Sequence, residues 1–119
     1  MITPRIDGGV VTWDNDSETI NIPCENSKFA IYNSNNEMVY VMCKSEELNI
    51  EQLNLYKADG SLFASIPPPE GFSFYYMLPY EGLGVSVICS TDNPAENRPD
   101  WHFKFDDISK TLIRHCPAY

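Results

Sequence analysis

Side chains that could do chemistry are few in this sequence, and their spacing keeps them apart. There are two histidines, His102 and His115, and Cys116 follows the second directly. Neighbours in a strand point to opposite faces, so we do not expect His115 and Cys116 to form a thiolate–imidazolium pair. His102 and Asp106 share one strand face but are about 13 Å apart at the usual rise per residue, which is too far for a hydrogen bond.

Motifs with a known catalytic mechanism are absent as well. The sequence has no Gly-rich phosphate loop, no Gly-x-Ser-x-Gly turn and no His-Glu-x-x-His zinc motif. We therefore predict a protein that is not an enzyme and that needs no cofactor or metal. The alternative is an enzyme whose carboxylates are brought together by folding, because such a pair leaves no pattern in a sequence.

The four cysteines are far apart and form no Cys-x-x-Cys pair; they are Cys24, Cys43, Cys89 and Cys116. No apolar stretch follows the charge in residues 1–5, so we expect no signal peptide and a cytoplasmic protein. The reducing cytoplasm disfavours disulfides, which predicts four free thiols. Cys89 alternates in phase with Val85 and Val87, as a small buried hydrophobe would. A zinc site built from all four cysteines and a secreted protein with two disulfides are the alternatives.

The charge balance restricts the partners. The chain has 17 acidic and 8 basic residues, a net charge of -9. Such a charge repels nucleic acid phosphates and anionic lipids, so neither nucleic acid nor a membrane is expected, and a charged partner should be basic. We expect the contact surface to gather loop carboxylates, namely Asp14, Asp16, Glu18, Glu46, Glu47, Asp92, Glu96 and Asp100. The alternative is that the acids serve only solubility.

The elements that position these groups are hairpins. In residues 53–66, Leu53 and Leu55 share one strand face, Asp59-Gly60 supplies the turn, and Leu62, Ala64 and Ile66 share a face of the returning strand. The same pattern fits residues 11–22, 29–42 and 103–116, with turns at 17–18, 35–36 and 109–110.

The whole chain, residues 1–119, is one domain that needs no staple. We predict an all-β antiparallel meander of nine to ten strands, forming a sandwich or a partly closed barrel. No run of the sequence approaches the length of a membrane span. At most one short helix is expected, where Ser45 precedes two acids; the parity change between Ile50 and Leu53 requires this helix or a bulge near Gln52.

Alternation also predicts which side chains are buried. The expected core residues are Phe29, Ile31, Leu53, Leu55, Leu62, Phe74, Val85, Val87, Trp101, Phe103 and Phe105. In residues 72–78 the even positions look like core. Tyr75 and Met77 then point outward, and with Tyr80 they form an aromatic patch of the kind enriched at protein interfaces. The alternative is that this strand is covered on both faces.

Four segments resemble a family of small bacterial immunity proteins that accompany polymorphic toxins, including those of contact-dependent growth inhibition (CDI) systems. They are residues 68–76 (PPEGFSFYY), 84–90 (GVSVICS), 100–105 (DWHFKF) and 113–119 (IRHCPAY), and the resemblance covers roughly residues 53–119. It implies a cytoplasmic protein that binds one cognate toxin domain and blocks its active site. No contact residue can be transferred, because such families vary most where they touch the toxin.

Two functions from different classes follow. In the first, the protein inhibits a basic toxin domain, an RNase or DNase whose substrate groove accepts an acidic protein in place of phosphates. Tyr75 and Tyr80 are further candidate contacts, and no small-molecule substrate is expected. In the second, it is a β-sandwich adaptor or structural subunit that uses an exposed strand edge.

Overall fold

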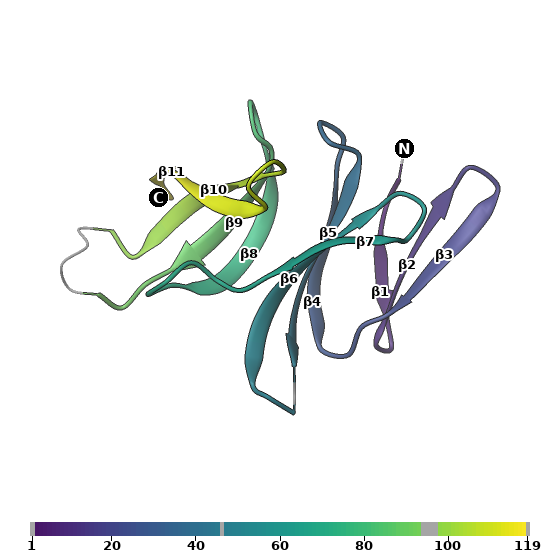
Figure 1. Ribbon diagram of the computed structural model, residues 1–119, viewed down its shortest axis with the longest axis horizontal. Helices are drawn as coiled ribbons and strands as arrows, with labels where there is room; N and C mark the ends of the chain where they lie inside the picture. Colours follow the sequence, from purple (N-terminus) through teal and green to yellow (C-terminus); the bar gives the residue numbers. More distant parts are fainter. Residues whose placement is uncertain (1, 46, 94–97, 119) are drawn as a thin grey trace.

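The computed structural model describes residues 2–45, 47–93 and 98–118, which form eleven strands and no helix (Figure 1). The all-β prediction is confirmed, and none of the described segments is a helix that could cross a membrane. The strands are β1 (Arg5–Asp7), β2 (Val10–Asn15), β3 (Glu18–Pro23), β4 (Ser27–Asn33), β5 (Met38–Ser45), β6 (Ile50–Lys57), β7 (Leu62–Ile66), β8 (Ser73–Tyr80), β9 (Gly84–Ser90), β10 (Asp100–Asp106) and β11 (Thr111–Pro117).

Consecutive strands form three antiparallel sheets: β1–β3, β4–β7 and β8–β11. The middle sheet lies between the other two (Figure 1). The middle sheet can be covered on both sides because both faces of its strand β5 are apolar. Val39, Val41 and Cys43 pack toward Val11 and Trp13 of the first sheet. The intervening residues of β5, Met38, Tyr40 and Met42, join the core shared with the third sheet. The arrangement is a stack of layers and not a closed barrel.

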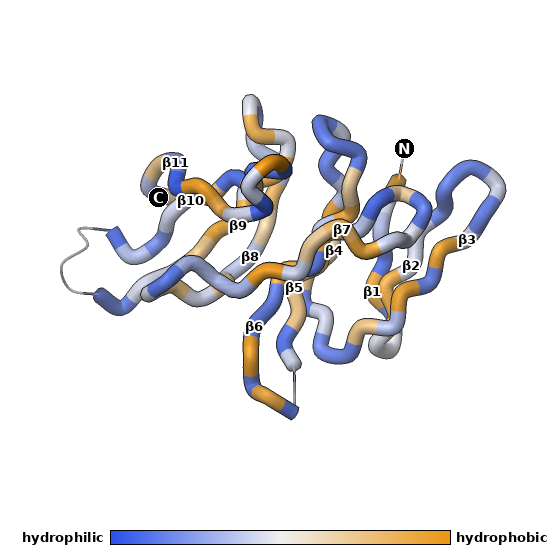
Figure 2. The backbone as a smooth tube through the Cα atoms, viewed as in Figure 1, coloured by the Kyte–Doolittle hydropathy of each residue, from blue (hydrophilic) through white to orange (hydrophobic). Residues whose placement is uncertain are grey.

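The hairpin over residues 53–66 turns at Asp59-Gly60, as predicted. Gly60 has φ +93° and donates its N–H to the Lys57 carbonyl at 2.9 Å, while the Asp59 carboxylate accepts the N–H of Ser61 at 2.9 Å. A Cβ on Gly60 would lie 2.8 Å from Cγ2 of Ile20. The turn therefore packs against the first sheet, which only a glycine permits. This and the β2–β3 and β4–β5 turns are hydrophilic in Figure 2, whereas the apolar residues follow the strands.

Two expected core residues are exposed instead. A bulge opposite Leu55 and Tyr56 makes Phe63 an extra residue of β7, so Leu62 and Ala64 do not share a face; Leu62 is 57% exposed and Phe63 packs on the core. Phe29 is 40% exposed, beside a bulge in the edge strand β4. The prediction was confirmed for Leu53, Leu55, Phe74, Val85, Val87, Phe103 and Phe105, while Ile31 and Trp101 are partly buried against the same core.

A further bulge changes the expected faces of β8. It lies between Phe74 and Tyr76, so Tyr75 is the extra residue and the parity reverses after it. Met77 is 9% exposed and belongs to the core, so the prediction that it points outward is wrong. Tyr75 is outward, as predicted, with 55% of its surface exposed.

Residues 47–49, before β6, form a turn. Strands β5 and β6 pair without a shift from Met38–Lys57 to Ser45–Ile50, so neither the short helix nor the bulge near Gln52 is present among the described residues. Leu48 and Ile50 break the parity because they are exposed at the hairpin tip. The sequence interpretation also missed β1, which pairs with β2 at one edge of the first sheet.

Candidate functional site

The predicted acidic contacts of residues 14–18 lie at one end of the molecule. Asp14 and Glu18 belong to β2 and β3, and the turn itself is Asp16-Ser17 and not 17–18. Asp16 has φ +57°, which an Asp tolerates in a tight turn. The carboxylate of Asp14 accepts a hydrogen bond from Oγ1 of Thr19 at 3.1 Å and lies 4.0 Å from the Arg5 guanidinium. Both charges of that pair are exposed, so it adds little stability.

The other predicted acids lie elsewhere. Asp92 and Asp100 flank the connection between β9 and β10, at the end of the molecule opposite the β2–β3 turn (Figure 1), and the molecule is 49 Å along its longest axis. Glu47 lies at the β5–β6 turn, a third place. Glu46 and Glu96 fall outside the described residues. Those of the predicted carboxylates that lie in the described part of the chain are therefore not gathered into one surface.

The outer face of the third sheet, turned away from the middle sheet, carries an aromatic patch. It consists of Tyr75, Tyr76, Leu78, Tyr80, His102 and Ile113, which alternate with the core residues or stand at a bulge. The rings of Tyr75 and Tyr76 meet edge to face at 4.7 Å between centroids. Tyr75 and Ile113 are 55% and 53% exposed, and no further sheet of the described chain covers this face.

A polar pair lies under this patch. Ser86 and Ile88 are fully buried although they belong to the outer face of β9. The Ser86 hydroxyl is 2.7 Å from Nδ1 of His102, and the His102 ring meets the Tyr80 ring edge to face at 4.3 Å. Burial and the neighbouring His115 lower the pKa of His102, which favours the neutral ring. Since the Ser86 hydroxyl has no exposed surface, it cannot reach a substrate as a nucleophile, and the pair holds the patch in place.

His115 and Cys116 both lie near Tyr80, which simple strand alternation did not predict. A bulge opposite His102 and Phe103 makes His115 the extra residue of β11. Both residues consequently approach Tyr80: its ring is 6.1 Å from the His115 ring, and its hydroxyl is 3.9 Å from Sγ of Cys116. Tyr80, predicted as a contact, is thus partly buried within the patch. Among the described residues, no group of three His, Cys, Asp or Glu side chains could hold a metal ion.

Asp100, one of the predicted acidic contacts, lies on the same sheet face as the patch. It pairs with Ser90 on the outer face, at the end of the sheet, and its carboxylate accepts the Ser90 hydroxyl at 2.6 Å. It precedes His102 by two positions on β10, so both side chains belong to the same face. Of the predicted acids that the structure describes, Asp100 is the one on the sheet face that carries the tyrosines.

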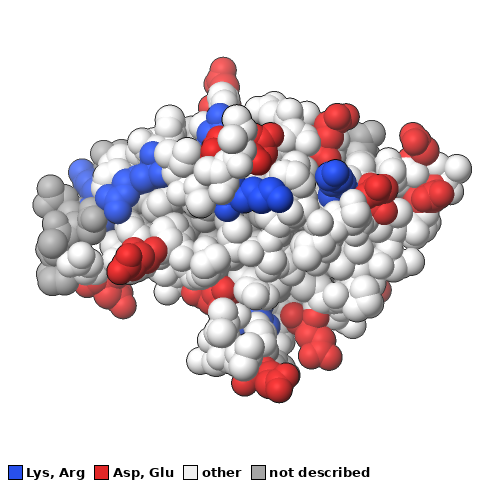
Figure 3. Space-filling view, viewed as in Figure 1, with Lys and Arg blue, Asp and Glu red and all other residues white. Residues whose placement is uncertain are grey.

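The structure also has a surface of basic side chains that the sequence did not predict. Lys and Arg form a row across the view in Figure 3, with acids above and below the row and at one end. Three of the described basic side chains lie over aromatic rings. The Lys57 and Lys110 ammonium groups lie 6.0 and 4.6 Å from the centre of the Phe63 ring. The Arg114 guanidinium lies 5.1 Å and 4.8 Å from the centres of the Phe72 and Trp101 rings.

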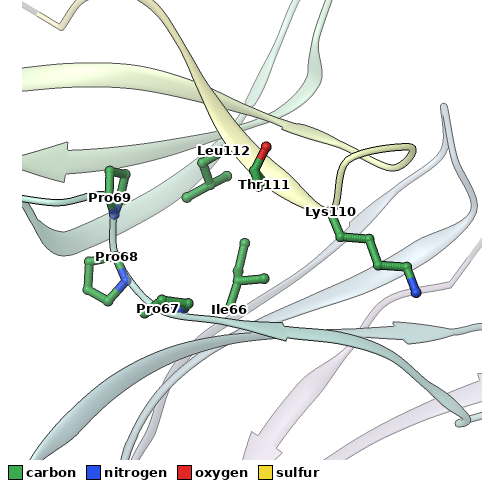
Figure 4. A pocket seen from close by; sticks show the side chains of 7 residues that line it. All are labelled: Ile66, Pro67, Pro68, Pro69, Lys110, Thr111 and Leu112. Carbon is green, nitrogen blue, oxygen red and sulfur yellow. The ribbon is translucent and has the colours of Figure 1, made fainter.

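Lys110 also lines an apolar cavity of about 200 Å³ between the edge strands β7 and β11 (Figure 4). Its lining residues are Ile66, Pro67, Pro68, Pro69, Lys110, Thr111 and Leu112. The three prolines directly follow β7, and they carry no N–H that could extend it. This cavity and the Ser86–His102 pair were missed because both depend on strand register, which periodicity does not give.

No known family model, no curated protein and no solved structure matches the chain.

Proposed function

We propose that the protein is an immunity protein that acts in the bacterial cytoplasm, binding a cognate toxin domain and blocking its active-site groove. The observation that carries this proposal is the outer face of the third sheet, with Tyr75, Tyr76 and Tyr80 on rigid strands and no covering layer in the described chain. The resemblance of residues 53–119 to immunity proteins points the same way, and this range includes all of β8–β11.

The patch has the chemistry of a protein-binding surface. Tyrosine offers a large apolar ring and a hydroxyl, and it loses few rotamers on binding, which is why it is enriched at binding hot spots. The hydrogen-bonded Ser86–His102 pair and the Tyr75–Tyr76 contact restrict these rings before a partner arrives. Preorganisation of this kind reduces the entropy lost on association.

The acidic charge supports a basic domain as the partner, most simply an RNase or DNase with a groove for phosphates. The net charge of -9 attracts such a domain from a distance. Asp100, at the end of the patch, is placed to meet an Arg or Lys of the groove. Asp14, Asp16 and Glu18 lie at the far end of the molecule, so in this proposal they make no contact and act on the encounter only as part of the net charge at low salt, where screening is weakest.

An adaptor or structural subunit is the second candidate, favoured by one observation. Strand β11 is an edge of the third sheet, and its Ile113 is 53% exposed, so another chain could add a strand there. In that case the partner would pair with the backbone of β11, and truncating tyrosine side chains would matter little.

The test is co-expression with the toxin domain encoded by the reading frame directly upstream. The proposal expects the protein to restore growth and to copurify with that domain as a complex. Raising salt from about 0.05 to 0.5 M shortens the Debye length from roughly 14 to 4 Å, so association should slow several-fold. Growth arrest that persists despite soluble protein, with no complex, would reject the proposal.

Two charge variants separate steering from contact. Changing Asp14, Asp16 and Glu18 to Asn, Asn and Gln should lower the association rate and leave dissociation unchanged. Asp100→Asn should instead speed dissociation, by the loss of about 2 to 5 kcal/mol expected for a desolvated charge pair. If both variants keep wild-type rates at low salt, carboxylates do not guide this interaction.

A further inference from the structure

Cys24 and Cys43 lie together in a cavity on the face of the middle sheet that is opposite the third sheet. Both belong to the core shared by the first and middle sheets, and they are 9% and 7% exposed. Cys24 follows β3, where its N–H donates to the Gly9 carbonyl at 2.8 Å, and Cys43 lies in β5. Although 18 residues separate them in the sequence, both line the same cavity and belong to the same buried cluster.

The cavity has about 280 Å³ of space and a polar lining, so small polar molecules can enter it. Besides the two cysteines it is lined by Glu25, Lys44, Ser45, Glu47, Gln52 and Asn54. The Asn54 amide donates to Sγ of Cys43 at 3.6 Å, and the Cys43 thiol has the Gln52 carbonyl as an acceptor at 3.7 Å. These contacts hold Cys43 in position beside Cys24.

The two thiols differ in acidity. The neighbouring Cys43 thiol lowers the pKa of Cys24 to about 6, against the effect of burial, and Ser27 contributes in the same direction. The pKa of Cys43 is raised by the neighbouring Cys24 and by burial. The charged residues that line the cavity with the two cysteines are Lys44, Glu25 and Glu47. Cys24 is consequently the nucleophile of the pair at neutral pH.

We propose that Cys24 and Cys43 form a redox site that reacts with peroxides and closes to a disulfide. The Cys24 thiolate attacks one oxygen of the peroxide, the O–O bond breaks, and Cys24 becomes a sulfenic acid while the leaving oxygen takes a proton as water. The Cys43 sulfur then attacks the Cys24 sulfur, forming the S–S bond and releasing the sulfenic oxygen as a second water with the Cys43 proton. The dithiol loses two electrons and the peroxide gains them.

The disulfide would fasten the end of the first sheet to the centre of the middle sheet. Cross-linking the connection after β3 to β5 restricts the unfolded chain, so the oxidised protein should unfold at higher denaturant concentration than the reduced protein. The site is separated from the aromatic patch by the middle sheet and the third sheet, so this inference does not depend on the proposed function.

The remaining thiols provide internal controls. Cys89 is fully buried in the other core, and desolvation raises its pKa to about 12, so it stays a thiol. Cys116 lies beside Tyr80 on the third sheet. Cleavage after Lys and Arg, except before proline, puts each cysteine in a separate peptide: residues 6–28, 29–44, 58–104 and 115–119.

The experiment treats the reduced full-length protein with a small excess of hydrogen peroxide and maps the products by mass spectrometry. We expect the intact mass to fall by two hydrogens and the cross-link to join peptides 6–28 and 29–44. Cys43→Ser should leave a sulfenic acid on Cys24 that a 1,3-diketone traps, and Cys89→Ser should behave as the unaltered protein. A cross-link through Cys89 or Cys116, or peroxide treatment without a Cys24–Cys43 cross-link, would overturn the proposal.

A pH profile tests the assigned roles without any substitution. Alkylation of Cys24 by iodoacetamide should reach its maximal rate about two pH units lower in the folded protein than in urea, where the thiol has its ordinary pKa near 8.5. Identical profiles in the folded and unfolded protein would contradict the assignment of Cys24 as the nucleophile.

Discussion

Replacing Gly84 by alanine tests how the hairpins of the middle and third sheets meet. Gly84 begins β9 with φ +77°, and a Cβ there would lie 2.9 Å from Cγ and even closer to Oδ1 of Asn33, at the end of β4. It would also lie 2.8 Å from Nδ2 of Asn35. Asn33 is buried, donates to the Tyr40 hydroxyl at 3.1 Å and accepts the N–H of Asn35 at 2.9 Å. The new methyl group must displace this network.

Two contributions set the expected loss in the free energy of unfolding. A residue with a Cβ in the left-handed region costs about 1 to 2 kcal/mol. Leaving the buried Asn33 or Tyr40 polar atoms unpaired costs about 1 to 3 kcal/mol more. Gly84→Ala should therefore lower the free energy of unfolding by about 2 to 5 kcal/mol. Gly82→Ala is the matched control, because Gly82 has φ +87° but nothing within 4 Å of its added Cβ. It should lose only the first contribution.

Urea unfolding followed by tryptophan fluorescence measures both variants, since Trp13 and Trp101 lie in different sheets. The difference between the two variants isolates the contact with Asn33 from the backbone strain. Equal losses of stability in Gly84→Ala and Gly82→Ala would refute the close approach of the two hairpins, and with it the packing of the β4–β5 turn on the third sheet.

Two further predictions concern the core and the effect of pH. Phe103→Ala should lower the free energy of unfolding by about 3 to 5 kcal/mol, as for other buried phenylalanines, whereas Phe29→Ala, at an exposed position, should change it by less than about 1 kcal/mol; similar losses in the two variants would contradict the positions of the bulges. The pKa of His102 is lowered in the folded protein, whereas in the unfolded chain it has its ordinary value near 6.5. Below that pH the unfolded chain therefore binds more protons than the folded protein. Stability should therefore fall as the pH drops below about 6.5, and the slope should diminish in His102→Asn, measured by urea unfolding at each pH; an unchanged slope in the variant would assign the effect to other groups.

Local sequence patterns located the hairpins, although the first turn lies at Asp16-Ser17 and not at 17–18. Asp59-Gly60 predicts its turn because both residues have conformational preferences that act over four positions. Alternation likewise placed Leu53, Leu55 and Phe103 in the core, because inward and outward residues differ in polarity on strands covered on one side.

Bulges and the stacking of the sheets could not be predicted from local sequence patterns. An inserted residue such as Phe63 or Tyr75 reverses the parity of a strand, but it is chosen by pairing with another strand and leaves no local signature. The apolar run in β5 shows that both faces are covered, yet it does not say by which strands. The meeting of Cys24 with Cys43 and of Ser86 with His102 depends on that arrangement, so neither pair could be predicted.

The measurement that tests the proposed binding surface most directly is the dissociation constant for the upstream toxin domain, compared between Tyr75→Ala and Phe29→Ala. Both residues are exposed aromatics, 55% and 40% respectively, but only Tyr75 belongs to the aromatic patch. A hot-spot tyrosine should cost about 2 kcal/mol or more, so Tyr75→Ala should weaken binding about 30-fold while Phe29→Ala binds as the unaltered protein does. Unchanged affinity in Tyr75→Ala would contradict the assignment of the outer face of the third sheet as the toxin-binding surface.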